Sequence, residues 1–334
     1  MGIWRIGADV LAGGRFAISP LAETLAVLGA LTGWERGTVQ RHWADGQRPE
    51  FERWLAGEPV TAALIEAAFR PTWTADFIST PPRPGDRTFH DELRRVRETP
   101  PEVARADLEY ALTGPLPQPL RVPDLPHRAA ELLDWVWTRA VRPDWGRRRR
   151  LLEADIVSRT QWLSSGGWAA ALEGLRPGLR WLGDGRLRIN AYNNPPRDLR
   201  RAQLYFVPTT SSRGWFDWNE PDFYAIVYPC QGLLADAHQA TPPGALSALI
   251  GPVRARVLTL LEAPMSTTQL VAVTGYTLGT VGGHLKVLLD SGLARRRRSG
   301  RSVLYYRTPT ADQLIALGPV TRGTGKPGHR PDGL

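Results

Sequence analysis

The chain has 334 residues, a net charge of +9, 42% hydrophobic residues and a single cysteine. This length and apolar content are enough to bury real cores, in about two domains. Cys230 alone cannot form an intrachain disulfide, which favours a reducing cytoplasm. Charged residues interrupt the first thirty positions, so the sequence predicts neither a signal peptide nor a membrane span.

The N-terminal part of the chain is predicted to be mainly helical. Residues 3–6 and 15–18 are strand candidates on either side of a Gly-Gly turn. Ser19 and Pro20 begin a predicted helix that ends near Leu31. A Pro-rich connector at 113–126 either divides this part in two or crosses its surface. The other predicted helices span residues 50–56, 59–69, 89–98, 101–112, 127–140, 147–164 and 166–173.

Strand patterns follow between Leu179 and Tyr228, at 186–190, 202–207 and 224–229, and predict a small β-sheet. Gly-rich phosphate loops, Cys/His ligand sets and hydrolase motifs do not occur in the sequence, so we expect no enzyme activity, no metal and no cofactor. The aromatic residues of 215–228 are best explained as ordinary core. The alternative is an apolar ligand pocket lined by Trp215, Trp218 and Tyr224.

Charge and tryptophan both change sharply along the chain. From Ala245 onward there are twelve Lys and Arg against four Asp and Glu, a net charge of +8, whereas residues 1–244 hold thirty against twenty-nine, a net charge of +1. All thirteen tryptophans lie at or before Trp218. Together with a Thr-Pro-Pro-Gly stretch, these changes place a domain boundary near residue 244. A basic module joined to a nearly neutral body is typical of polyanion binding.

The basic module has the element order of a helix-turn-helix. One helix is predicted from Leu246 to Leu261, a second over TTQLVAVT with a cap at Ser266 or Thr267, and a third after an N-cap at Thr277. The third helix buries one stripe of Val281, Leu285 and Leu288. LARRRR and RSVLYYR then form a hairpin, a wing, turning at Ser299-Gly300. We therefore predict a body at 1–243, a winged helix-turn-helix at 244–318 and a flexible tail at 319–334.

Residues 246–309 resemble the ArsR-type winged-helix repressors, in the run LIGPVRARVLTLL, the TVGGHLKVLLDSGL recognition helix and the arginine-flanked wing ending in YYR. The opening WRIGADVLAGGRFAISPLAETLAVL and the YPCQG turn resemble an N-terminal domain found beside such modules in actinobacterial regulators. The resemblance implies a homodimer on double-stranded DNA. The family's metal-sensing positions read TTQLVAV and TADQLIAL here, so we do not expect metal sensing.

Candidate DNA contacts follow from helical geometry and from the predicted wing. Opposite the buried stripe lie Gly279, Gly283 and Lys286, with Thr280 somewhat off centre, and the N-terminal end of such a helix enters the major groove. The glycines indicate either close approach to the duplex or mere composition. His284 either packs or donates to a phosphate, and Lys286 contacts phosphate or only solvent. The full set of candidates is Thr277, Gly279, Thr280, Gly283, His284, Lys286, Arg295, Arg297, Arg298 and Arg301.

Two runs of four arginines differ in their surroundings. The run at 295–298 belongs to the predicted wing, and no acidic residue lies between Asp290 and Asp312, which suits the phosphate backbone or a minor groove. The run at 147–150 enters a helix that continues with acidic residues, so we expect local ion pairs on a solvated face.

The sequence thus predicts an α+β protein that regulates transcription, a repressor that binds a pseudo-palindromic operator as a homodimer. The body would supply dimer contacts, sensing of a small-molecule effector, or both. Two alternatives stay open. One is an architectural, nucleoid-binding protein with weak sequence specificity. The other is an enzyme in the body that the winged helix directs to DNA.

Overall fold

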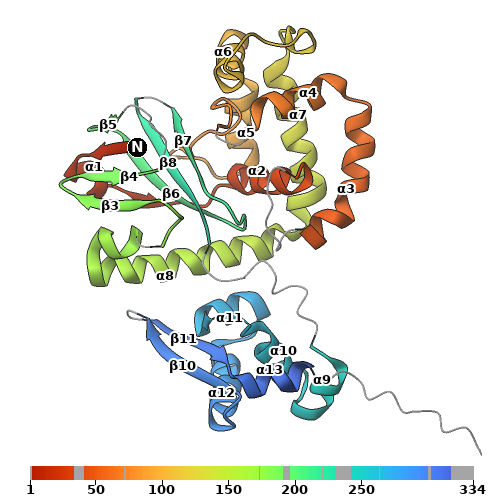
Figure 1. Ribbon diagram of the computed structural model, residues 1–334, viewed down its shortest axis with the longest axis vertical. Coiled ribbons are helices and arrows are strands. Elements are labelled where there is room, and N and C mark those ends of the chain that lie inside the picture. Colours follow the sequence, from red (N-terminus) through yellow and green to blue (C-terminus); the bar gives the residue numbers. More distant parts are fainter. Residues whose placement is uncertain are drawn as a thin grey trace, which may run out of the picture. The chain divides into compact units, whose positions relative to one another are not determined.

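The computed structural model describes residues 2–33, 41–70, 73–172, 174–190, 196–219, 221–230, 242–262, 264–299 and 302–316. The chain divides into two compact units, whose described residues are mainly 2–230 and 242–316. The first unit, the body, mixes helices with two sheets, and the second is a small helical unit with one sheet (Figure 1). The fold class is therefore α+β. Over the described ranges, no helix is long and apolar enough to cross a membrane. The tail at 319–334 lies outside the described residues.

The helical half of the body surrounds α2, in which every residue is buried. Ser19 caps this helix by accepting a hydrogen bond from the Ala22 amide, as the Ser-Pro start predicts. One hydrophobic cluster joins residues of all the surrounding helices. The helices are α2 (Pro20–Leu31), α3 (Arg41–Ala56), α4 (Pro59–Ala68), α5 (Phe89–Arg97), α6 (Pro101–Leu112) and α7 (Leu125–Val136).

The Pro-rich connector between α6 and α7 does not separate two cores. Leu116, Leu120 and Leu125 are buried in the same cluster as the helices on both sides. The short 3-10 helix η1 (Gln118–Leu120) forms its middle. Proline removes backbone donors, and here it shapes a connector that adds apolar side chains to the core.

Two four-stranded sheets form the other half of the body, where the sequence predicts one small sheet. Each sheet mixes parallel and antiparallel pairs. The first has the order β3-β4-β1-β5 and the second the order β2-β6-β8-β7. The strands are β1 (Ile3–Ile6), β2 (Arg15–Phe16), β3 (Arg180–Gly183), β4 (Arg186–Arg188), β5 (Arg197–Leu199), β6 (Gln203–Thr209), β7 (Trp215–Asn219) and β8 (Phe223–Pro229).

The central strands β6 and β8 explain the apolar runs AQLYFV and YAIVYP. They pair in parallel, and nearly every residue in both is buried. One face packs against the other sheet through a cluster that includes Trp4, Phe206 and Ile226. The opposite face packs against Ala22 of α2. A parallel pair covered on both faces reads as a continuous apolar run rather than an alternation.

The two strand candidates at 3–6 and 15–18 are both strands, the second one shorter than expected. A short helix, α1 (Ala8–Ala12), lies between the two segments, and they join different sheets as β1 and β2. Three further strands, β3, β5 and β7, were not predicted because they are short or carry charged residues. β5 is held by pairing with the distant β1, whereas β3 and β7 pair with the strands that follow them directly, β4 and β8.

The predicted helices at 127–140, 147–164 and 166–173 are connected differently from the expectation. After α7 the chain continues as a π-helix at Trp137–Val141 and a 3-10 turn at Arg142–Asp144. It then enters α8 (Trp145–Leu172), which runs along the sheets (Figure 1). Gly167 has φ 65° inside α8, so the predicted break between two helices exists as a kink.

The expectation of a solvated face for the first arginine run is wrong at its centre. The Arg148 side chain is only 7% exposed and pairs with the fully buried Glu23 of α2. Thr210, after β6, donates to the same carboxylate through its backbone amide. Arg149, 61% exposed, makes the expected pair with Glu153 at 2.9 Å. Adjacent residues of this run therefore differ: Arg148 makes a buried ion pair with α2, and Arg149 makes an exposed ion pair within α8.

Two more charged residues of α8 lie in the core instead of on a solvated face. Asp155 and Arg159 are also buried, with 3.8 Å between the Arg159 Nε and the Asp155 carboxylate. The Arg159 guanidinium lies 5.2 Å from the ring centre of Tyr228 on β8. These charges form part of the contact between α8 and the sheet.

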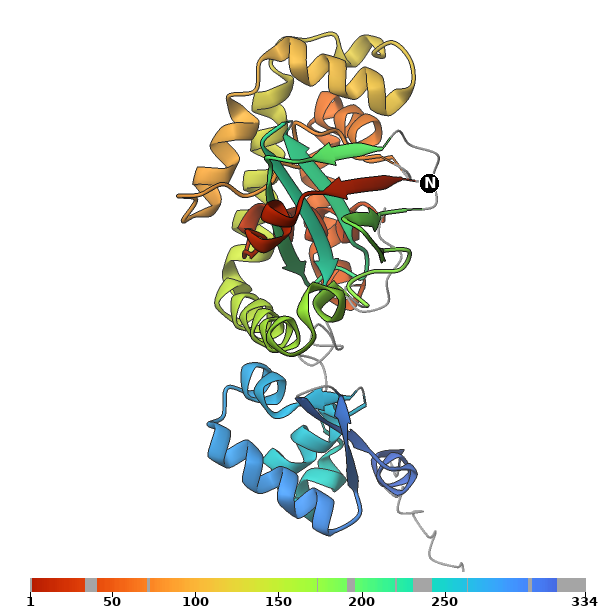
Figure 2. The same ribbon diagram turned by 90° about the vertical axis from the view of Figure 1, so that its left-hand side faces the viewer.

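The second unit begins with two helices where one was predicted. Gly251, with φ 84°, separates α9 (Gly244–Ile250) from α10 (Pro252–Leu260), because Pro252 starts a new helix at its N1 position. Three further helices are α11 (Thr267–Thr274), α12 (Leu278–Asp290) and α13 (Pro309–Ala316). A three-stranded sheet of order β10-β11-β9 completes the unit, from β9 (Met265–Ser266), β10 (Ala294–Ser299) and β11 (Ser302–Arg307) (Figure 2).

Arg148→Ala should lower the free energy of unfolding by about 3 to 5 kcal/mol, because it leaves the buried Glu23 carboxylate without its partner. Arg149→Ala, one residue away, removes only an exposed pair and should cost about 0 to 1 kcal/mol. Chemical denaturation of both variants beside the unmodified protein measures the difference. Equal losses would show that the Glu23 contact does not hold the body together.

Candidate functional site

The helix-turn-helix of the second unit consists of α11 and α12. Ser266 and Gln269 form a reciprocal capping box at the start of α11, which confirms the predicted cap. Gly275 ends α11 in the left-handed region, at φ 74°, which a residue with a Cβ rarely adopts. Thr277 then caps α12 by accepting from the Thr280 amide at 3.2 Å, again as predicted. The turn between the two helices is thus fixed by local chemistry.

One face of α12 is buried and the opposite face is free. Val281, Leu285 and Leu288 are the buried residues, as the periodicity predicts. Gly279 and Gly283 are exposed, and a Cβ added at either would meet no atom of the chain within 4 Å. The same holds for the half-buried Gly282. Neither backbone conformation nor packing within the chain therefore requires a glycine at these three positions.

Three of the polar candidates already have hydrogen-bond partners within α12 or at its cap. The Thr277 and Thr280 hydroxyls lie 2.9 Å apart. Lys286 donates to Asp290 one turn further on, at 2.8 Å, and this bond raises the lysine pKa. His284 is half-buried beside the apolar stripe. A phosphate would have to compete with Asp290 for Lys286, so this lysine is a weaker candidate than the sequence alone indicates.

Leu278 is a candidate that the sequence analysis missed. It stands three residues before Val281, so the periodicity places it at the edge of the buried stripe, yet 63% of it is exposed. The reason is its position at the first residue of α12, ahead of the core. An apolar side chain at this end of the helix suits contact with a thymine methyl group.

The hairpin of β10 and β11 carries the second arginine run. Arg295, Arg296, Arg297 and Arg298 are all exposed. Arg297 lines a cavity together with Glu262 and Asp312, whose carboxylates pair with Arg307. Because side chains alternate along a strand, Arg296 and Arg298 lie on the same face as the buried Ala294. Gly300 and Arg301, in the predicted turn, lie outside the described residues.

The end of the hairpin is anchored to the helices. Arg307, the arginine of YYR, pairs with Asp312 of α13 and donates to the Thr259 carbonyl of α10 at 3.2 Å. The Thr308 amide donates to the Leu293 carbonyl at 3.0 Å, which ties together the two ends of the hairpin. β9 pairs with β11 through Met265 and Tyr305. Arg307 therefore stabilises the fold of the second unit, whereas the exposed arginines of β10 can contact another molecule.

The aromatic candidates of the body do not line one pocket. Tyr224 is buried between the sheets, 5.4 Å from the ring centre of Trp4. Trp215 packs against the helical core and donates to the Ser79 hydroxyl at 3.1 Å. Among the cavities of the described residues, Trp218 lines one in the body. The surroundings of Tyr224 and Trp215 fit the favoured explanation of ordinary core, and neighbouring positions on β7 and β8 belong to different cores.

Comparison with known families gives one match. A family model described as a helix-turn-helix domain matches residues 249–297, from the end of α9 to β10. No curated protein and no solved structure matches the chain. The second unit is thus a helix-turn-helix domain, which is a DNA-binding fold.

Gly279→Ala and Gly283→Ala should each stabilise the domain, by up to about 1 kcal/mol, because alanine favours a helix and both positions have room for a methyl group. Both should nevertheless weaken DNA binding, since we expect the exposed face of α12 to come closest to the duplex. Gly282→Ala, on the flank, should stabilise without that loss. Thermal unfolding and a DNA titration of the three variants measure the two effects. Undiminished affinity at Gly279 and Gly283 would leave composition as the reason for the glycines.

Proposed function

We propose that this protein is a transcriptional regulator, a repressor, that binds double-stranded DNA with α12 in the major groove and the β10–β11 hairpin on the backbone or minor groove. The observation that carries the proposal is the helix-turn-helix itself. The exposed face at the N-terminal end of α12 carries small side chains, and a basic hairpin follows directly. This is the arrangement by which helix-turn-helix proteins read base edges and fix their register on phosphates.

Sequence readout would depend on few side chains. Thr280 offers a hydroxyl and a methyl group, and Leu278 offers an apolar surface. The exposed glycines would let the helix backbone approach closely. Arg298, one of the predicted contacts, and Arg296 on the same face of β10 would contact phosphates or enter a minor groove.

An architectural role with weak specificity is the second candidate, favoured by the glycine-rich face of α12. The two functions differ in the ratio of affinities for a selected site and for random DNA. A regulator shows a ratio of about 10³ or more at fixed salt, whereas an architectural protein shows a far smaller one. Selection of bound duplexes from a random pool, followed by titration of both, distinguishes them.

The body would contribute dimer contacts and effector sensing, and would not act as an enzyme. Dimerisation through the body is supported by the small size of α13, which has eight residues, compared with the large apolar core of the body. A homodimer would match a pseudo-palindromic operator, because the two-fold symmetry of the protein is repeated in its site.

Arg296→Ala combined with Arg298→Ala should weaken binding to specific and random DNA alike. Each lost phosphate contact should reduce the slope of log affinity against log salt by about one unit, so the double variant loses up to about two. Arg149→Ala, an exposed arginine of the body, serves as the matched control and should leave the slope unchanged. Equal loss of slope in the control would mean that the body also lies along DNA.

A fragment of residues 244–334 should be monomeric and bind DNA much more weakly than the full chain, because it lacks the dimer contacts of the body. Sedimentation at micromolar concentration, beside the full-length protein, measures this. A dimeric fragment would place the interface in the second unit, where Leu249 of α9 is 68% exposed.

A further inference from the structure

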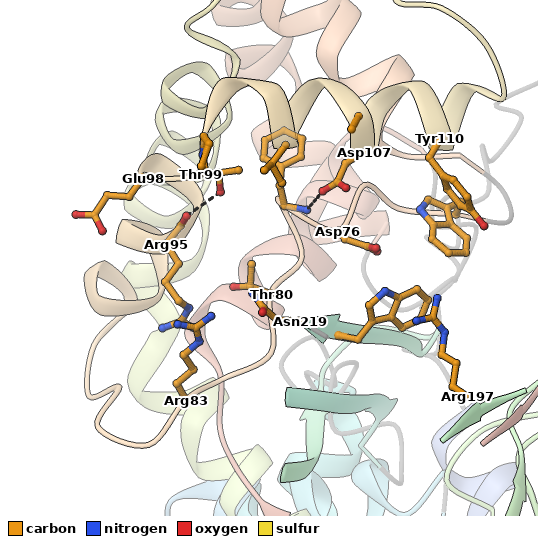
Figure 3. Close-up of a pocket in the computed structure, with 16 residues that line it drawn as sticks. Asp76, Thr80, Arg83, Arg95, Glu98, Thr99, Asp107, Tyr110, Arg197 and Asn219 are labelled. Carbon is orange, nitrogen blue, oxygen red and sulfur yellow. Dashed lines mark hydrogen bonds between the residues drawn. The ribbon is translucent and has the colours of Figure 1, made fainter. Parts of the chain in front are cut away.

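A cavity of about 730 Å³ opens in the body (Figure 3). Its walls are α6, the loop at 73–80 and the strands β5 and β7, all within the first unit. Its volume lies within the range of sites that bury a small organic molecule. Nothing in the proposed DNA contacts uses it.

Three aromatic rings form one wall. Trp73 lies 4.6 Å from Tyr110 and 5.2 Å from Trp218, measured between ring centres. Their planes are inclined at 56° and 69°, so faces and edges both border the space. Tyr110 is 63% exposed, which is high for a large aromatic side chain. This wall presents π-electron density at the mouth of the cavity.

A carboxyl group borders the aromatic wall, since the Asp76 side chain accepts a hydrogen bond from Trp218. In Figure 3 the Asp76 side chain points into the space between Tyr110 and Arg197. Burial, reinforced by the carboxylates of Asp107 and Asp217, raises the pKa of Asp76 to about 8, although Arg197 and a hydrogen bond from Trp218 act in the opposite direction. Asp107 accepts from the Phe77 amide at 2.8 Å, and Asp217 from the Trp215 indole at 3.1 Å. Asp76 likewise has favourable partners in Trp218 and Arg197, and its side chain points into the cavity (Figure 3).

The protein already places a cation on this wall. The Arg197 guanidinium lies 4.1 Å from the centre of the Trp218 ring. Thr80 also lines the cavity, and its hydroxyl has no hydrogen-bond partner among the described residues although the atom is buried. An aromatic wall, a buried carboxyl group and an unused hydroxyl are the three elements of a site for a positively charged organic group.

We propose that this cavity binds an organic monocation with an aromatic or branched apolar body, held between the Asp76 carboxylate and the wall of Trp73, Tyr110 and Trp218. The cation would favour the ionised form of Asp76, and its apolar body would cover the rings. At the other end of the cavity Arg95 is paired with Asp86 at 2.7 Å, and Arg83 lies over Phe223. These two arginines are engaged with their own partners, which favours the cation over an anionic ligand.

The test uses the full chain and two probes of the same shape and opposite charge, tetraphenylphosphonium and tetraphenylborate. The phosphonium should quench tryptophan fluorescence and bind, while the borate should not. Because the probe does not titrate, its affinity should rise about tenfold from about pH 7 to about pH 9 as Asp76 ionises. Asp76→Asn should remove most of this rise and lower the affinity at high pH by about tenfold or more. A smaller rise should remain from Asp217, because burial raises its pKa to about 7. Asp184→Asn, at a site 91% exposed, is the matched control.

Neither Asp76→Asn nor Tyr110→Ala should prevent folding, so a change in phosphonium binding can be attributed to the cavity. Asp76 is mostly protonated at neutral pH, so its neutral amide replacement should leave thermal unfolding at pH 7 nearly unchanged. Tyr110→Ala removes an exposed ring and should still reduce phosphonium affinity severalfold. Equal binding of both probes, no binding of the phosphonium, or an unaltered pH profile in Asp76→Asn would each overturn the proposal. None of these outcomes depends on DNA binding.

Discussion

The body of this protein depends on the buried carboxylate of Glu23. This residue lies in the first turn of α2, which is buried along its whole length, and it accepts hydrogen bonds from Arg148 of α8 and from Thr210 after β6. Three segments that are far apart in sequence therefore meet at one charge. Burying an ion pair gains little by itself, but removing one partner leaves the other charged and unsolvated. The helical half, the long helix and the sheets are thus held in a single arrangement.

The second unit is organised by shorter-range contacts. Caps at Ser266 and Thr277 and the left-handed Gly275 define the helix-turn-helix, while Arg307 and Thr308 fix the base of the hairpin. These contacts are mostly between neighbours in sequence. They leave most of the exposed side chains of α12 and β10 accessible to another molecule. The division of charge agrees with this: the body is nearly neutral, and the basic residues in excess lie after residue 244.

The local elements could be predicted from the sequence, and the long-range ones could not. Ser19-Pro20, Ser266 and Thr277 mark helix starts that the structure confirms, since capping depends only on adjacent residues. Arg148 was misjudged because its partner Glu23 is 125 positions away, whereas Glu153, the visible acid, pairs with Arg149.

The spacing of apolar residues is also a poor guide at helix ends, because it does not show where the core stops. Leu278 fits the buried stripe of α12, but it precedes the part of the helix that reaches the core. The candidate cation site could not be inferred at all, because its carboxyl and aromatic groups come from α6, β7 and the loop at 73–80. Of the aromatic candidates only Trp218 belongs to it, and no spacing in the sequence indicates that.

Hydroxyl-radical footprinting of the full chain on a selected duplex tests the central claim most directly, because it shows where α12 and the hairpin lie. A regulator that docks two helix-turn-helix domains should protect two half-sites whose centres are about 10 base pairs, one helical turn, or a multiple of it apart. Continuous protection without half-site boundaries, at the same occupancy, would contradict sequence-specific docking.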